Sequence, residues 1–143
     1  MALPEGLRLT LVQGRSHEAL AAADTVLVAS GTATLEAALF RRPMVIAYRL
    51  AWLSYRIMHK RGYLPWIGLP NILAGDSVVP EFIQQAATPE AMGAALLAQL
   101  DDERARARIA ERFEAMHLSL RCGCAQRTAD VLLELIDGPP PRV

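Results

Sequence analysis

The apolar residues in the first third of the chain predict strands that alternate with helices. Leucines alternate with polar residues over 7–13, which predicts a strand with one apolar face. A continuous apolar run over 25–29 is typical of a strand buried on both faces, and residues 44–48 form a third strand. Helices are predicted between these strands, over 15–24 and 31–40. Crossovers of about ten residues favour parallel strands with right-handed connections, which predicts an α/β fold of the doubly wound type.

The pattern beyond residue 49 is mostly helical, apart from an expected loop over 62–76 that is dense in glycine and proline. Thr88 is predicted to cap a helix that has Pro89 in its first turn. The helices are expected over 50–61, 78–86, 89–100, 102–120 and 125–136.

Three parallel strands make a small sheet, because sheets average about five or six strands and a bare edge invites pairing. We therefore expect an oligomeric partner or a missing N-terminal segment to complete the sheet. The expected organisation is a Rossmann-like half domain over 1–100 that is incomplete at its N-terminus, C-terminal helices over 101–136, and a disordered tail over 137–143.

Composition narrows the function classes. The 143 residues suit one domain, 52% of them are hydrophobic, and the formal net charge is zero, so no global field attracts nucleic acid. Asp24 and Glu36 interrupt the most apolar stretch, 22–40, so no transmembrane helix is expected, nor is a signal peptide. Cys122 and Cys124 are expected to be ordinary reduced thiols, because a disulfide between residues so close is strained and zinc needs more ligands.

A ligand is expected at the carboxyl ends of the strands, where ligands gather in open α/β sheets. The loops at residues 13–16, 30–32 and 48–49 are expected to meet there. Residues 30–32 open a helix, so free backbone N–H groups and the positive end of its dipole would suit a phosphate. The alternative is that Ser30 only caps the helix and Gly31 only makes the corner.

Glu36 lies four residues after Thr32 on the same helix face, one turn below the expected phosphate site. A carboxylate there can accept two hydrogen bonds from a ribose diol. The alternative is a salt bridge to Arg41, Arg42 or Arg49.

Three segments carry a resemblance to a known family. They read SGTATLEAALFRRPMVIAYR from residue 30, WIGLPNILAG from residue 66 and CAQRTADVLLEL from residue 124. In this order, over nearly the whole chain, they resemble the C-terminal part of the lipid-A-disaccharide synthases. That family belongs to the GT-B glycosyltransferases, which have two Rossmann-like domains with the active site between them. The resemblance thus implies a partial Rossmann-like fold of the GT-B C-terminal type.

The resemblance also implies a reaction in lipid A (lipopolysaccharide) biosynthesis. UDP-2,3-diacylglucosamine would donate its sugar to 2,3-diacylglucosamine 1-phosphate, with no cofactor and no metal. The enzyme would be cytoplasmic and peripheral on the inner membrane. The family's acceptor domain and general base are expected to be absent from this chain, so its catalytic residue is unknown. We expect no transferase activity from the chain alone, which an assay for the disaccharide checks.

Residue roles follow from the resemblance by position. Residues 30–32 would hold the diphosphate, Glu36 the ribose and the segment around 13–16 the uracil. Tyr48 and Arg49 would lie beside the leaving phosphate or the sugar. The residues expected on the UDP donor side are Gln13, Gly14, Arg15, Ser30, Gly31, Thr32, Glu36, Tyr48, Arg49 and Asn71.

Residues 37–75 contain six basic and six aromatic side chains but no acid. Three interpretations stay open: contact with an anionic membrane surface or acyl chains, a core helix with a solvated cationic face, and nucleic-acid binding. The helix expected over 50–61 is apolar around most of its circumference, and the acylated substrates favour the first interpretation over nucleic acid. The resemblance further allows a homodimer in which the last helices cross to a second copy. A non-catalytic nucleotide-binding or dimerisation module is the alternative to the enzyme.

Overall fold

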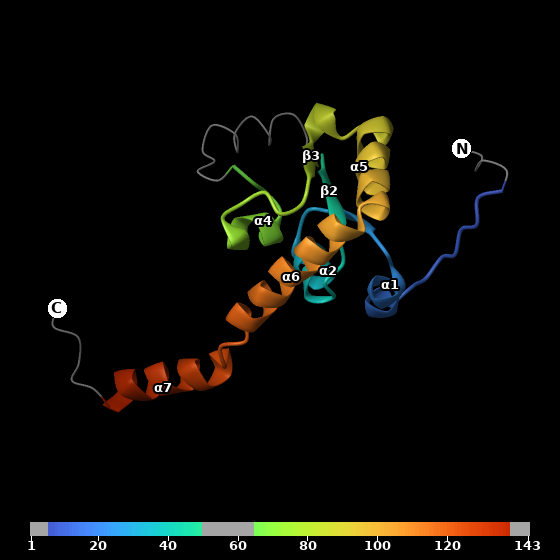
Figure 1. Ribbon diagram of the computed structural model, residues 1–143. Helices are drawn as coiled ribbons and strands as arrows, with labels where there is room; N and C mark the ends of the chain where they lie inside the picture. The colour runs from blue at the N-terminus through green and yellow to red at the C-terminus, as the bar shows by residue number, and fades with distance from the viewer. Residues whose placement is uncertain (1–5, 50–64, 138–143) are drawn as a thin grey trace.

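The computed structural model describes residues 6–49 and 65–137, which form a small α/β body and one helix that leaves it (Figure 1). The elements in chain order are α1 (Ser16–Ala22), β1 (Val26–Ala29), α2 (Thr32–Leu39), β2 (Met44–Tyr48), α4 (Leu69–Ala74), β3 (Glu81–Ile83), the 3₁₀ turn η1 (Gln84–Ala86), α5 (Pro89–Asp101), α6 (Glu103–Leu120) and α7 (Cys124–Asp137).

The sheet is open and parallel, with the strand order β1-β2-β3. Val28 pairs with Ile46, and Ile46 pairs in turn with Glu81 on the other side. In the described part of the chain, helices lie between the parallel strands as expected for a partial Rossmann-like sheet, and the predicted α/β class is confirmed.

Helices cover the two faces of the sheet unequally. α2, α4 and α6 pack together on one face, whereas α5 lies against β1 and β2 on the other (Figure 1). Successive side chains of a strand point to opposite faces, so Met44 and Ile46 join the core under α2 and α6 while Val45 is buried on the other face. Phe113 of α6 is the largest side chain of this core.

β1 differs from its prediction. β2 has buried residues at three successive positions, as a strand covered on both faces should, but β1 alternates between half-buried and exposed residues. Val26 and Val28 pack on the core, whereas Leu27 is 50% exposed. The expectation that β1 is buried on both faces is therefore wrong, because α5 lies mainly over β2.

The predicted strand over 7–13 is also wrong. Residues 7–12 form no helix or strand and run out from the body, opposite to α7 (Figure 1). Leu7, Leu9 and Leu11 are exposed. Within the described residues, no sheet edge pairs with this segment. The third strand is β3 instead.

The segment read as a short helix over 78–86 contains β3, which pairs with β2 through Phe82 and Ile83. Pro80, directly before the strand, has no N–H to donate, and its carbonyl accepts from Ile46 N–H at 3.0 Å. The expected loop over 62–76 contains α4, which begins with proline in its first turn and ends at Gly75 in the left-handed conformation. The helix expected over 50–61 lies outside the described residues.

The remaining helices agree with their predictions within one or two residues. Thr88 caps α5 by accepting from Ala91 N–H at 3.2 Å, and Asp102 caps α6 by accepting from Ala105 N–H at 2.8 Å. Residues 124–136 of α7 are exposed on every side, including five large apolar side chains. No helix in the described part of the chain is both long and apolar enough to cross a membrane.

Candidate functional site at the carboxyl edge of the sheet

The corner between β1 and α2 is built around Gly31. Its φ of 140° and ψ of −166° lie in a region that favours glycine, and it precedes α2 without any side-chain cap. Its carbonyl accepts both the hydroxyl of the buried Thr34, at 2.7 Å, and the Thr34 amide, at 3.1 Å. Residues 31–33 are exposed, and no described residue accepts from their backbone N–H groups. These amides at the positive end of α2 are available to an anion.

Ser30 ties this corner to two neighbouring segments. Its amide donates to the Ala47 carbonyl of β2 at 3.2 Å, and its hydroxyl donates to the Ile67 carbonyl at 3.2 Å. The alternative that Ser30 caps α2 is therefore wrong, since Gly31 occupies the cap position and the Ser30 hydroxyl is used elsewhere.

The end of β2 lies beside this corner. Because Ala29 pairs with Ala47, the last residue of β2, Tyr48, and Arg49 after it lie next to residues 30–32. Tyr48 is half-buried and Arg49 is exposed. The structure thus brings together two of the three loops that were expected to meet, with one cation at the edge of the site.

Glu36 lies on α2 about 6 Å along the helix axis from Thr32. Its carboxylate is 3.6 Å from Nε2 of His17, an exposed side chain, and is itself 42% exposed. The alternative to a ligand was a salt bridge from Glu36 to an arginine. Such a bridge does not form with Arg41 or Arg42, because Arg41 pairs with Glu114 and Arg42 donates to the carbonyl of Ala21.

The segment that contains Gln13, Gly14 and Arg15 lies elsewhere. It precedes α1, whose His17 ring lies tilted against that of Phe40 with ring centroids 5.6 Å apart, so this segment approaches the C-terminal half of α2 rather than the corner. Since 7–13 is not a strand of the sheet, its loop does not share the carboxyl edge.

Arg15 has a local partner. Its guanidinium donates to the carboxylate of Glu18, which raises the pKa of Arg15 and lowers that of Glu18. Both side chains are exposed. In this structure, therefore, Arg15 does not point into the site at the corner.

Asn71 is fully buried in the first turns of α4, and both ends of its amide are occupied. Nδ2 donates to the Val79 carbonyl and to Glu81 Oε1, each at 2.8 Å. Oδ1 accepts from the amides of Val78 and Val79, at 2.9 and 3.0 Å. The side chain fixes the loop between α4 and β3, and no surface of it is open to a ligand in this structure.

Sequence reasoning missed Glu81, which continues this network toward the corner. Its carboxylate accepts from the amides of Ile67 and Gly68, at 2.9 and 3.0 Å. Ile67 in turn accepts from the Ser30 hydroxyl, so a chain of hydrogen bonds runs from β3 to the corner. Glu81 was overlooked because its segment was read as a helix, in which it would have been one of many surface acids.

Gly68 lies where this segment crosses the sheet. A Cβ atom at this position would collide with Cδ1 of Ile46 and lie 2.9 Å from Glu81 Oε1. The backbone therefore approaches β2 closely enough for Glu81 to reach two successive amides.

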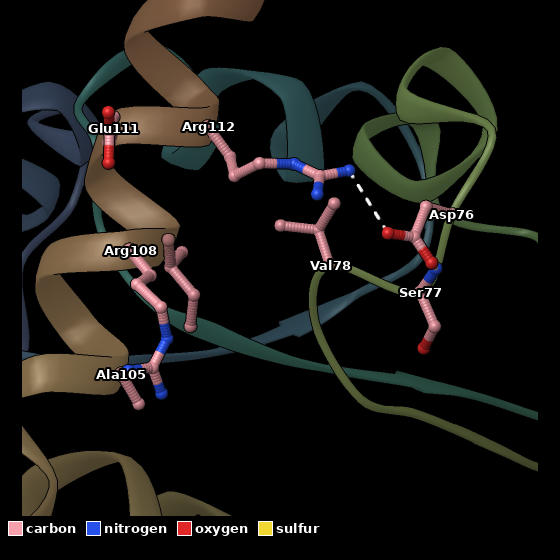
Figure 2. Close-up of a pocket in the computed structure, with 8 residues that line it drawn as sticks. Asp76, Ser77, Val78, Ala105, Arg108, Glu111 and Arg112 are labelled. Carbon is pink, nitrogen blue, oxygen red and sulfur yellow. Dashed lines mark hydrogen bonds and ion pairs between the residues drawn. The ribbon is translucent and has the colours of Figure 1, made fainter.

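A hollow of the described surface lies between α6 and the residues that follow α4 (Figure 2). It measures about 440 Å³ and separates residues 76–78 from α6. Arg112 reaches across it to Asp76, with Nη2 and Oδ2 3.1 Å apart. None of the residues expected on the donor side lines it, and we assign it no ligand. The described residues contain no group of three or more His, Cys, Asp or Glu side chains that could hold a metal ion.

Comparison with known proteins identifies the family to which the chain belongs. A sequence model of the lipid-A-disaccharide synthetases matches residues 4–133. The chain belongs to this family. A lipid-A-disaccharide synthase of Thiobacillus denitrificans is 56% identical over 131 residues, and that of Cupriavidus pinatubonensis is 55% identical over 130. These matches cover 92% and 91% of the chain but 35% and 32% of the relatives, so the chain spans about a third of their length.

A third synthetase, from Burkholderia mallei, is 52% identical over 136 residues, which are 95% of this chain and 35% of the relative. The resemblance inferred from the three motifs is therefore confirmed, and it concerns one part of a longer family sequence. The corner at residues 30–32 and the segment at 66–75 both lie inside the region that the synthetase family matches.

Proposed function

We propose that this chain supplies the donor-nucleotide side of a lipid-A-disaccharide synthase. The enzyme would transfer 2,3-diacylglucosamine from UDP to 2,3-diacylglucosamine 1-phosphate during lipid A biosynthesis. Membership of the family supports the reaction class. The observation that carries the proposal is the exposed corner at residues 31–33, whose amides have no acceptor among the described residues.

The proposed chemistry uses fixed dipoles. The amides of residues 31–33 and the positive end of α2 would bind the diphosphate of the donor. As the bond to the anomeric carbon breaks, negative charge grows on the departing UDP, and preorganised N–H donors stabilise that charge without reorganising. Arg49, exposed at the same edge, adds a positive charge. The acceptor hydroxyl and its base are assigned to no residue of this chain.

Glu36 would accept hydrogen bonds from the ribose hydroxyls. Its present partner, His17, is 3.6 Å away and exposed, and exchanging such a surface contact for a ligand loses little free energy. Asn71 has a different part in this proposal. It is buried, so it would hold Glu81 and the loop between α4 and β3 instead of touching the nucleotide. The uracil-side role of residues 13–15 stays a prediction.

Titration with UDP tests the ribose assignment. Loss of a hydrogen-bonded carboxylate weakens binding by about tenfold or more, since such bonds contribute about 1.5–3 kcal/mol. We expect this rise in Kd for Glu36→Ala in calorimetry, and no change for Glu111→Ala, an exposed acid on α6. Equal Kd values for Glu36→Ala and the parent would remove the ribose assignment. No binding of UDP by the parent chain would contradict the donor site itself.

We further propose that the protein lies on the cytoplasmic face of the inner membrane, in contact with anionic lipid. The basic and aromatic residues of 37–75 support this proposal, although 50–64 are outside the described residues. Vesicle flotation measures it: recovery with anionic vesicles should exceed recovery with neutral ones and decrease as salt is added. Equal recovery with both lipids would contradict the electrostatic attraction.

The exposed apolar side chains of α7 favour a second candidate, a dimerisation module. In that case α7 would pack against a second copy, and the chain could bind nucleotide without catalysing transfer. Sedimentation over a range of protein concentrations separates a monomer from such a dimer.

A further inference from the structure

Two thiols meet in the connection between α6 and α7. α6 ends at Leu120, and α7 begins at Cys124, so the connection contains Cys122 and Gly123. The sulfur atoms of Cys122 and Cys124 lie 3.3 Å apart, and both side chains are exposed. The described residues place no acid or histidine with them in a metal-binding group, so the pair stands as two thiols alone.

The turn at Gly123 holds the two thiols together. Its φ of +64° is left-handed, a conformation that glycine adopts without strain but other residues disfavour. An S–S bond is about 2.05 Å long, so closing it from this contact requires the sulfurs to approach by only about 1.2 Å. The chain is therefore already turned in the direction that a bond between these residues requires.

We propose that Cys122, Gly123 and Cys124 form a redox-responsive dithiol, which a small disulfide such as oxidised glutathione converts into a ring at the α6–α7 connection. One cysteine thiolate attacks a sulfur of the glutathione disulfide, forms a mixed disulfide and releases one glutathione thiolate. The second cysteine thiolate then attacks the cysteine sulfur of the mixed disulfide and releases the other glutathione. Two electrons pass to glutathione, and the two protons end on the two glutathione thiols.

The contact also affects the acidity of Cys124. The hydrogen bond with Cys122, and then the charge of Cys122, raise the pKa of Cys124. Since the thiolate is the attacking species, the first step should become faster as pH rises.

The ring is expected to be reversible. Only one residue separates the cysteines, and the strain of so short a loop makes a disulfide easier to reduce than an unstrained structural one. Closing it would fix the direction in which α7 leaves the body. α7 is exposed over residues 124–136, so its direction is set mainly at this connection.

Mass spectrometry of the whole chain tests the proposal. Reduced protein is equilibrated with glutathione at rising ratios of disulfide to thiol, and the remaining thiols are then blocked with a maleimide. The expected product has lost two hydrogen atoms, carries no glutathione and takes up no maleimide. Cys122→Ser and Cys124→Ser should each stop with one glutathione attached. Addition of two glutathiones to the parent, or disulfide-linked dimers in place of the ring, would overturn the proposal.

Gly123→Ala tests the contribution of the turn. Alanine in a left-handed conformation should slow the ring-closing step by about five- to thirty-fold, while the first attack of a cysteine thiolate on the glutathione disulfide keeps its rate. An unchanged rate of ring closure would overturn the assignment of the contact to the glycine turn. Because nothing lies within 4 Å of the added methyl group, a collision would not explain the slowing.

Discussion

The centre of the sheet and the last helix both carry strongly apolar patterns, but their surroundings are opposite. Met44, Val45 and Ile46 are fully buried between helices on both faces of β2. On α7, Leu133 and Leu135 are 56% and 73% exposed. The difference teaches that an apolar pattern identifies a surface that can be buried, while its actual burial depends on whether another element lies against it.

The strongest test of this comparison is a pair of truncations. Phe113→Ala removes the largest buried side chain and should lower the free energy of unfolding by about 3–5 kcal/mol. Leu133→Ala on α7 should change it by less than about 0.5 kcal/mol, because its side chain is exposed. Urea unfolding measures both. A loss at Leu133 that approaches the loss at Phe113, and grows with protein concentration, would show that α7 is buried against a second copy.

Asn71→Ala tests a second kind of contact in the buried region, because it removes hydrogen bonds, whereas Phe113→Ala removes apolar contacts. It leaves the amides of Val78 and Val79 without their acceptor and removes one of three donors to the Glu81 carboxylate, and should cost about 3 kcal/mol. Asn71→Asp is the matched control: it keeps the acceptor but brings a second carboxylate to Glu81. Its stability should improve on acidification, because a proton on either carboxyl restores one donor. Parent-like stability of Asn71→Ala would contradict the role of this network.

The sequence predicted those elements of the fold that depend on neighbouring residues, and it failed where an element depends on a partner far away in the chain. The cap at Thr88, the helix over 102–120 and the strand over 44–48 depend on neighbouring residues, and all are confirmed. The strand over 7–13 was wrong because its pairing depends on a distant edge. β3 was missed for the same reason, since three residues beside a proline become a strand only next to β2.

The features of the candidate site also fall into those that neighbouring residues predict and those that depend on distant ones. The corner at residues 30–32 and the position of Glu36 follow from a short strand, a glycine and a helical spacing. The exposed amides and the neighbouring end of β2 agree with that prediction. The burial of Asn71 and the part of Glu81 could not be predicted, because both depend on hydrogen bonds between residues seven or more positions apart.

The smallest expected effect lies at the surface of α1. Arg15 lowers the pKa of Glu18, so this pair stabilises the folded state above the ordinary carboxyl pKa, and the contribution disappears as pH falls through the lowered value. Both groups are fully exposed, so the change in stability should be too small to detect by urea unfolding. Carboxyl titration by NMR should show the pKa of Glu18 returning toward its ordinary value in Arg15→Ala. An unchanged titration would contradict the ion pair.

The tight crossing at Gly68 has a consequence for how changes could spread through this small protein. A methyl group added at Gly68 would push the backbone away from Ile46. The hydrogen bonds from the amides of Ile67 and Gly68 to the Glu81 carboxylate would then weaken. The Ile67 oxygen would then move away from the Ser30 hydroxyl. A defect in the packing of the central strand would thereby become a displacement of the corner at residues 30–32, without any change to a residue of that corner.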